Sequence, residues 1–402
     1  MGKNAFNNVI INGMILAEDG KKMAKKLKNY PDPEYLFNKY GSDAYRLYML
    51  SSPGVRAEPV KFSEKGVDQI YKDFTAAILN AYKFFETYAK VDNFSYKKPT
   101  TYFLRHGEAD GETPETKLTK KAKTHMESAE FVEKVLRVNP DIIYTSNFMR
   151  AQETAQAVQE IMQKYLGKKV EINVDEHLSD EQSLETYKQI LNKDEGNVLI
   201  VSHLPQFQSI WQEYYQEAKE VEIHRMEFVQ LPSYKITNEL DKWILAELNN
   251  LGIELEAEMN KYLLDNGAKL VLGFIDKLNN RYIRRSRRRF WAAGMDADKT
   301  SAYNTMFEVL ENYMKLAAPF APFITEHIYL ELQKFKNEDT KAEPQSVHLT
   351  HLPLPSKHYI NKDLLSEIET VRRIISLGLF IRSKNKIAVK QPLQKIELKI
   401  DK

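Results

Sequence analysis

A short apolar run ends in two cationic side chains at Tyr102-Phe103-Leu104-Arg105-His106-Gly107-Glu108. Consecutive apolar residues bounded by polar ones are typical of a buried β-strand. His106 then falls at the carboxyl end of that strand, and in open α/β sheets this edge is where ligands bind. The stretch therefore predicts a strand that delivers Arg105 and His106 to a ligand site.

Two further segments repeat the combination of a strand with a polar end. Ile142-Ile143-Tyr144 precedes Thr145-Ser146-Asn147-Phe148-Met149-Arg150, and Val198-Leu199-Ile200-Val201 precedes Ser202-His203. With a fourth run at Val170-Glu171-Ile172, short strands alternate with helical stretches, which predicts a parallel α/β sheet. Two His and two Arg then meet at one edge, where each guanidinium can grip phosphate oxygens with two donors.

Helical periodicity flanks this α/β region on both sides. Apolar residues recur at i, i+3, i+4 and i+7 over residues 66–88, and the pattern resumes over about 240–381 with expected breaks at Gly267, Gly294 and Pro319–Pro322. The joints are expected at Lys97-Lys98-Pro99-Thr100 and Pro232-Ser233. We predict a multidomain α and α/β chain in which a three-layer α/β domain interrupts a helical bundle.

Composition excludes several classes of protein. The 402 residues, 28% of them charged, are enough for two to four globular domains and too apolar for a disordered chain. No apolar stretch approaches the ~20 residues that span a bilayer, so no membrane contact is expected, and the absence of Cys rules out disulfides and thiol nucleophiles. We expect a cytoplasmic protein with no metal site, because the His residues lack metal-ligand spacing.

The α/β segments resemble the histidine phosphatase (phosphoglycerate mutase-like) superfamily, whose pattern is Leu-x-Arg-His-Gly-Glu, Ser-x-x-x-Arg and a strand ending in Ser-His. The resemblance covers residues 101–231 and is similar to the small phosphohistidine phosphatase branch at Val201-Ser202-His203-Leu204-Pro205. It implies that His106 is the nucleophile and that Arg105, Arg150 and His203 hold the phosphoryl oxygens of a substrate of unknown identity. Asp180, with Glu181 beside it, is the candidate general acid, and no cofactor is implied. The alternative is an inactive lobe with structural histidines.

A Lys-rich loop stands at Leu16-Ala17-Glu18-Asp19-Gly20-Lys21-Lys22-Met23-Ala24-Lys25-Lys26-Leu27. With Tyr40-Gly41-Ser42-Asp43-Ala44-Tyr45-Arg46 and Val55-Arg56-Ala57-Glu58, it resembles the KMSKS region of class I aminoacyl-tRNA synthetases, specifically the isoleucyl type. Lys22-Met23-Ala24-Lys25-Lys26 occupies the signature, which implies ATP binding with Mg²⁺ in the complete synthetase. Ala24 and Lys26 replace the two Ser hydroxyls that would help to order the loop.

An arginine-rich run follows in the second helical segment, at Arg281-Tyr282-Ile283-Arg284-Arg285-Ser286-Arg287-Arg288-Arg289-Phe290-Trp291. At about 100° per residue its guanidiniums fill one face of a helix and its apolar residues the other. Such a face neutralises phosphates, and Trp291 can stack on an unpaired base. We predict tRNA contacts by Arg281, Arg284, Arg285, Arg288 and Trp291, with some arginines paired internally instead. Residues 232–385 also resemble the anticodon-binding domain of the same synthetase, which implies tRNA(Ile) as partner.

These resemblances divide the chain into five expected parts: residues 1–60 (KMSKS loop and stem-contact region), 61–96 (first bundle helix), 101–231 (phosphatase-like domain), 232–385 (anticodon-binding bundle) and 386–402 (start of a further region). The HIGH signature and an editing domain are not found in the sequence, so we expect that the chain alone does not charge tRNA. Whether a separate polypeptide supplies them or a truncated reading frame has lost them stays open. Two alternatives stay open: an active phosphatase docked by a tRNA-binding host, and a tRNA-binding module without chemistry.

Overall fold

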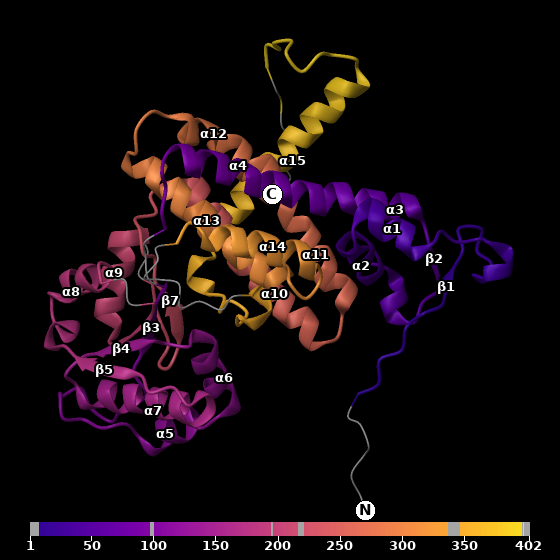
Figure 1. Ribbon diagram of the computed structural model, residues 1–402. Helices are drawn as coiled ribbons and strands as arrows, with labels where there is room; N and C mark the ends of the chain where they lie inside the picture. The colour runs from indigo at the N-terminus through magenta and orange to yellow at the C-terminus, as the bar shows by residue number, and fades with distance from the viewer. Residues whose placement is uncertain are drawn as a thin grey trace, which may run out of the picture.

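The computed structural model describes residues 8–96, 100–193, 196–215, 221–336, 346–395 and 397. Figure 1 shows an α/β lobe and a small N-terminal segment on opposite sides of a central helical bundle. Within the described ranges, no helix is both long and apolar enough to cross a membrane. The expected joint at 97–99 lies outside the described residues, whereas Pro232-Ser233 is a described loop between the lobe and the bundle.

The α/β lobe is built on a five-stranded sheet in the order β5-β4-β6-β3-β7. Its strands are β3 (Thr100–Arg105), β4 (Ile142–Thr145), β5 (Glu171–Val174), β6 (Asn197–Ser202) and β7 (Phe228–Gln230). The first four run parallel and overlap the four runs expected from sequence, whereas β7 pairs antiparallel with β3. The sheet is therefore mixed, and the prediction of a wholly parallel sheet is wrong in this respect. The sequence did not indicate β7 because a strand of three residues is too short to show an alternating pattern.

Helices cover both faces of this sheet. They are α5 (Lys120–Met126), α6 (Ala129–Val138), α7 (Met149–Leu166), α8 (Ser183–Ile190) and α9 (Leu204–Tyr215), with the 3₁₀ turn η4 (Glu176–Ser179). Alternate residues of β3 divide between the faces: Tyr102 and Leu104 join the core under α5, α6 and α7, while Phe103 joins the core under α8 and α9. The expected three-layer α/β architecture is confirmed.

The N-terminal segment is a small lobe tied to the bundle. It contains β1 (Ile15–Leu16), η1 (Lys25–Leu27), α1 (Pro33–Tyr40), α2 (Ser42–Leu50), η2 (Pro53–Arg56), β2 (Val60–Lys61) and α3 (Glu64–Ile70). Asp43, at the start of α2, accepts hydrogen bonds from the backbone N–H groups of Phe323 (3.2 Å) and Ile324 (2.6 Å). These are unsatisfied donors in the first turn of a bundle helix, so one carboxylate joins the two parts.

The bundle consists of long helices with two π-helical stretches. Its elements are η3 (Tyr71–Ala76, π), α4 (Ala77–Val91), α10 (Glu239–Asn260), α11 (Leu264–Asp276), η5 (Lys277–Ile283, π), α12 (Arg284–Trp291), α13 (Ala297–Ala317), α14 (Pro322–Gln333), the 3₁₀ turns η7 (Val347–Leu349) and η8 (Lys357–Tyr359), and α15 (Lys362–Lys384).

The break expected at Gly267 is wrong, because Gly267 lies inside α11. A Cβ at this position would meet Phe320 at 3.0 Å and both Leu255 and the Met259 sulfur at 3.2 Å. The glycine therefore serves close packing of α11 against neighbouring helices, which offsets its low helix propensity.

The α/β lobe and the bundle share one hydrophobic core. Trp211 of α9 packs against Tyr359 with ring centroids 4.9 Å apart, and the Tyr187 hydroxyl donates to the Pro232 carbonyl at 2.8 Å. On the other face, the guanidinium of Arg137 pairs with Glu256 of α10 at 2.8 Å. The chain enters and leaves the lobe side by side, since the Leu231 N–H donates to the Thr101 carbonyl at 2.8 Å. The lobe is thus both inserted in the bundle and packed against it.

Candidate functional site

His106 lies at the carboxyl edge of the sheet, where the ends of β3 and β6 meet at the pair Arg105 and Ser202. Its Nδ1 is 2.7 Å from the Gly107 carbonyl oxygen, a contact that requires a proton on Nδ1. Nε2 then carries the lone pair, and it accepts a hydrogen bond from Arg150 Nε at 3.2 Å. Burial, together with the charges of His203, Arg150 and Arg225, lowers the pKa of His106 to about 3. The ring is therefore a neutral, oriented nucleophile near pH 7.

His203 faces His106 across the site, with ring centroids 4.9 Å apart. Its Nε2 shares a 2.9 Å hydrogen bond with the Ser146 hydroxyl at the end of β4. Burial and the charges of Arg150 and Arg105 lower the pKa of His203 to about 4. Phe148 completes the wall: its ring is 4.7 Å from that of His203 and 4.7 Å from the Arg150 guanidinium. The two imidazoles predicted to meet are therefore adjacent.

The two expected arginines hold different positions around the histidines. Arg150, in the first turn of α7, also donates from Nη1 to the Thr113 carbonyl at 2.9 Å. Arg105 donates from Nη1 to the Ile223 carbonyl at 2.7 Å, while its Nε is buried without a hydrogen-bond partner among the described residues. The four groups expected from sequence, at positions 105, 106, 150 and 203, are thus brought together.

One cationic residue of the site was not predicted. Arg225, in the loop before β7, donates from Nη1 to the Gly107 carbonyl at 3.5 Å. After burial, its charge is the next cause that lowers the pKa of both Arg105 and Arg150. No motif surrounds Arg225, and it follows no strand end, so the sequence carried no signal for it.

Gly107 lets the loop after His106 pass close to the helices beneath it. A Cβ there would lie 2.9 Å from Leu118 and 3.2 Å from the Cβ of Ala122, and the Gly107 N–H donates to the Thr154 hydroxyl at 3.1 Å. The loop that orients the His106 ring is therefore fixed from both sides.

Asp180, the expected general acid, is bonded within its own turn. Its carboxylate contacts His177 Nδ1 at 3.0 Å and accepts the Gln182 N–H at 2.7 Å, and these contacts lower the pKa of Asp180. Among the described residues it bonds to neither site histidine. The turn itself lies near the site, since the Ser202 hydroxyl donates to the Leu178 carbonyl. The role of Asp180 stays a prediction.

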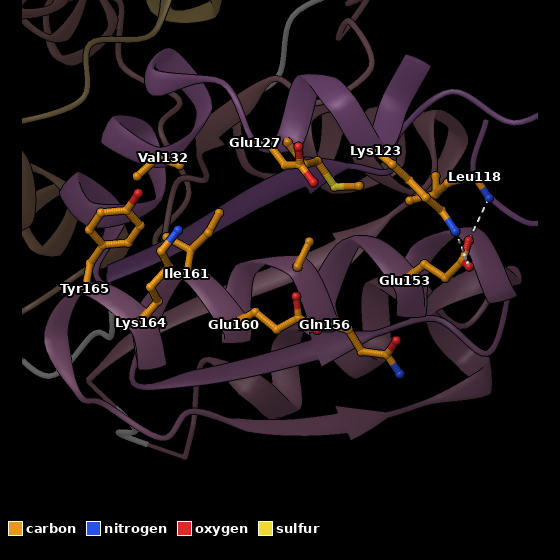
Figure 2. Close-up of a pocket in the computed structure, with 12 residues that line it drawn as sticks. Leu118, Lys123, Glu127, Val132, Glu153, Gln156, Glu160, Ile161, Lys164 and Tyr165 are labelled. Carbon is orange, nitrogen blue, oxygen red and sulfur yellow. Dashed lines mark hydrogen bonds and ion pairs between the residues drawn. The ribbon is translucent and has the colours of Figure 1, made fainter. Parts of the chain in front are cut away.

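A cavity of about 520 Å³ lies behind the loop that follows Gly107, between α7 and the pair α5 and α6 (Figure 2). Glu153 spans its end, where it accepts the Leu118 N–H at 2.7 Å and the Lys123 ammonium at 3.0 Å. Neither site histidine lines this cavity. Glu153 therefore fixes the loop rather than a substrate.

The Lys-rich loop is held by a side chain outside the predicted signature. Asn29 accepts the Ala24 N–H at 3.0 Å and donates to the Lys22 carbonyl at 3.2 Å. Lys22, Lys25 and Lys26 remain exposed, and Met23 is partly buried against the N-terminal core. Asn29 thus orders the loop where the two signature hydroxyls are replaced.

The arginine run divides into paired and exposed members. Arg289 forms a bidentate pair with buried Asp241 at 2.7 Å, and Arg281 contacts Asp276 at 3.3 Å. Arg284, Arg285 and Arg288 are exposed, as is Trp291, whose exposed fraction is 57%. Arg289 pairs internally, as expected for some members of the run. Residues 277–283 form a π-helix, so the 100° spacing does not hold across the run.

Three family models match separate parts of the chain. The model for class I tRNA synthetases (I, L, M and V) matches residues 1–87, and the model for the anticodon-binding domain of tRNA ligase matches residues 241–398. Between them, residues 101–183 match the histidine phosphatase superfamily (branch 1). The chain is therefore similar to class I tRNA synthetases at both ends, and between these two matches it is similar to the histidine phosphatase superfamily.

Among curated proteins, the chain is similar to isoleucine–tRNA ligases. It is 29% identical to that of Chlamydia trachomatis serovar D over 392 residues, which covers 98% of this chain and 24% of the relative. It is 28% identical to that of Treponema denticola over 394 residues, with 98% and 24% covered. The chain thus spans about a quarter of the length of the curated relatives it matches.

Two solved structures align with parts of the chain at low overall superposition. The LeuRS of Agrobacterium radiobacter K84, in a ternary complex with tRNA and LeuAMS, is 13% identical, covering 87% of this chain and 24% of that chain, with a TM-score of 0.35. The putative phosphohistidine phosphatase SixA from Agrobacterium tumefaciens is 25% identical, covering 28% of this chain and 75% of that chain, with a TM-score of 0.23.

Proposed function

We propose that the α/β lobe is a phosphatase that works through a phosphohistidine at His106. The observation that carries this proposal is the Nε2 lone pair of His106, unprotonated and 3.2 Å from the Arg150 guanidinium. Attack on phosphorus gathers negative charge on the phosphoryl oxygens, and Arg105 and Arg150 supply the fixed positive charge that stabilises it. His203 completes the site as a donor to one of these oxygens.

The proposed reaction has two steps. In the first, the Nε2 lone pair of His106 forms a bond to phosphorus, the bond from phosphorus to the leaving group breaks, and the leaving atom takes a proton from a general acid, for which Asp180 is the candidate. In the second step, water forms a bond to phosphorus and gives a proton to the conjugate base of the general acid, the bond from phosphorus to Nε2 breaks, and inorganic phosphate leaves with His106 neutral again. Arg150 must turn from Nε2 to the phosphoryl oxygens when substrate binds. We propose that this chemistry needs no cofactor.

Turnover of p-nitrophenyl phosphate by the full chain tests the proposal. His106→Ala should abolish phosphate release, because no other group replaces the nucleophile. His327→Ala is the matched control, since His327 is an exposed histidine of α14 in the bundle. The rate of this variant should stay near that of the wild type. Equal rates in wild type and His106→Ala would reject the phosphatase.

For the host, we propose the tRNA-binding and KMSKS functions of an isoleucine–tRNA ligase, with tRNA(Ile) as partner. The support is the anticodon-binding match over residues 241–398, together with the exposed guanidiniums of Arg284, Arg285 and Arg288 beside Trp291. The exposed ammonium groups of Lys22, Lys25 and Lys26 suit triphosphate charge, which in the whole ligase is that of ATP with Mg²⁺. Retention of tRNA by the chain, weakened by added salt, is the expected result; retention indifferent to salt would contradict it.

A second candidate function is a phosphatase that its host docks onto tRNA. The shared core between lobe and bundle favours it, because Trp211 and Tyr359 fix the lobe against the tRNA-binding helices. If the host docks the phosphatase onto tRNA, phosphatase activity should persist in the presence of saturating tRNA. The remaining alternative, a tRNA-binding module without chemistry, requires the His106→Ala experiment to show no difference.

A further inference from the structure

The described residues that precede β7, 221–227, place Arg225 beside the nucleophile. Arg225 Nη1 donates to the Gly107 carbonyl, the same oxygen that accepts the His106 Nδ1 proton. The Arg225 side chain is exposed, and this is its one hydrogen bond among the described residues. Its guanidinium is therefore near the attacking ring and still has donors to offer a ligand.

The loop that carries Arg225 has a strained backbone conformation that hydrogen bonds must stabilise. Met226, the next residue, has a φ of +62°, a left-handed conformation that is unfavourable for a residue that carries a Cβ. Two hydrogen bonds hold it: the Met226 N–H donates to the Arg105 carbonyl at 2.8 Å, and the His224 N–H donates to the Glu227 carboxylate at 2.7 Å. Glu227 thus closes the loop that presents Arg225.

The second carboxylate oxygen of Glu227 belongs to a contact with the host. His358 Nε2 is 3.1 Å from it and Lys357 Nζ is 3.3 Å from it, both in the bundle-side turn η8. Burial alone would raise the pKa of Glu227, but the hydrogen bonds from His358 and the His224 N–H, with the charges of His358 and Lys357, lower it to about 2. The carboxylate therefore stays charged while bridging lobe and host.

The turn that carries His358 is itself anchored in the bundle. The Ser356 N–H donates to the Asn249 side chain of α10 at 2.7 Å, and the Ser356 hydroxyl accepts the His358 N–H at 3.3 Å. The His358 ring also packs edge-on against Phe207 of α9, with centroids 5.8 Å apart. An unbroken set of contacts thus runs from α10 of the host to the loop of Arg225.

We propose that Arg225 binds the phosphoryl oxygens of the substrate and that the host holds it there through the Glu227–His358 pair. Arg225 is then a binding residue of the phosphatase site, and Glu227 and His358 are positioning residues that act through it. This inference rests on the proposed phosphatase function for its substrate class, a phosphoryl group. Its first consequence, binding of phosphate, can be measured without turnover.

Calorimetric titration of the full chain with inorganic phosphate tests Arg225. Arg225→Ala should weaken phosphate binding roughly tenfold or more, because a charge-assisted hydrogen bond is removed, and Arg225→Lys should restore part of the affinity. Arg372→Ala is the matched control, an exposed arginine on α15, and should bind phosphate like the wild type. Unchanged affinity in Arg225→Ala, or no measurable binding by the wild type, would overturn the proposal.

A double-mutant cycle tests the link to the host. His358→Phe keeps a ring against Phe207 but removes Nε2, and it should weaken phosphate binding severalfold in the wild-type background and not at all in Arg225→Ala. Lys357→Gln, an exposed and milder change, should weaken it less. With p-nitrophenyl phosphate, His358→Phe should raise KM and leave kcat nearly unchanged, which a general loss of folding would not do.

Additive effects of the two substitutions would reject the host link and leave Arg225 as a binding residue. The outcome is also separable from that of the phosphatase proposal. If His106→Ala and wild type hydrolyse p-nitrophenyl phosphate equally, the phosphatase fails, whereas the phosphate affinities still decide the role of Arg225.

Discussion

Arg289 and Asp241 form a bidentate ion pair inside the helical bundle, with both oxygens of Asp241 2.7 Å from guanidinium nitrogens of Arg289. The Asp241 side chain is fully buried and also accepts the Tyr282 hydroxyl at 2.7 Å. Arg289 also contacts Asp298 of α13 at 2.8 Å. It therefore holds α10, α12 and α13 together, although it belongs to a run of arginines that is otherwise suited to binding nucleic acid.

Arg289→Met should therefore act on stability more than on tRNA binding. It leaves the Asp241 carboxylate buried without its cation, and removing one partner of a buried pair costs about 3–5 kcal/mol. A urea unfolding curve of the bundle should shift to lower concentration, and Arg285→Met, the matched exposed control, should not shift it. An unfolding midpoint unchanged in Arg289→Met would show that the pair contributes little.

Arg284→Ala and Arg288→Ala should weaken tRNA retention instead. Each removes an exposed guanidinium, and the removal of one guanidinium–phosphate interaction should lower the salt dependence of binding by about one unit of log–log slope. Filter binding of tRNA(Ile) at several salt concentrations measures this slope. Arg281→Ala should have a smaller effect because Arg281 already contacts Asp276. Equal slopes in all variants would argue against this face as the tRNA-binding surface.

Gly107→Ala should disturb the phosphate site by crowding. The new Cβ would lie 2.9 Å from Leu118, and overpacking of this kind costs about 1–3 kcal/mol. Thermal unfolding and phosphate titration should both show the effect. The double variant Gly107→Ala/Leu118→Ala should recover phosphate affinity, since it removes the clashing side chain. No recovery would mean that the contact with Ala122, 3.2 Å from the new Cβ, limits the site instead.

Acid should destabilise the α/β lobe through its two histidines. The pKa of His106 is about 3 and that of His203 about 4 when folded, below the 6.5 of an unfolded histidine. The unfolded chain therefore binds more protons below pH 6.5, so stability falls as pH drops from 6.5 toward 3. His106→Asn should flatten this fall in thermal unfolding measured from pH 7 to 4, whereas exposed His177→Asn should not. Parallel curves for wild type and His106→Asn would refute the shift.

Glu308 should give the opposite pH dependence. It accepts the Tyr234 hydroxyl at 3.0 Å, and burial with the nearby charge of Glu311 raises the pKa of Glu308 to about 7 from 4.5. The folded chain binds more protons between these values, so this contribution to stability is lost as pH rises from 4.5 through 7. Glu308→Gln should therefore gain stability relative to wild type at pH 8 compared with pH 5. A pH-independent difference would place the raised pKa in doubt.

The sheet and its edge were predictable because their signals are local. Each of the four parallel strands is a short apolar run, and strand ends must meet at one edge, so positions 105, 106, 150 and 203 converge by topology alone. Arg225 was not predictable, since its place depends on the left-handed turn at Met226 and on Glu227. Internal pairing of some arginines was predicted, but not that Arg289 is one of them, because only tertiary packing shows that Asp241 lies beneath it.

The hydrogen bond between Leu231 and Thr101 shows that the chain enters and leaves the α/β lobe at neighbouring positions. A short turn could therefore connect the two host segments directly if the lobe were deleted. Excision would nevertheless uncover Tyr359, which packs against Trp211 and Tyr215 of the lobe and is nearly inaccessible to solvent in the intact chain. A host shortened in this way would expose an aromatic surface and would be prone to aggregation. The lobe and its host are therefore expected to depend on each other for the burial of Tyr359, Trp211 and Tyr215.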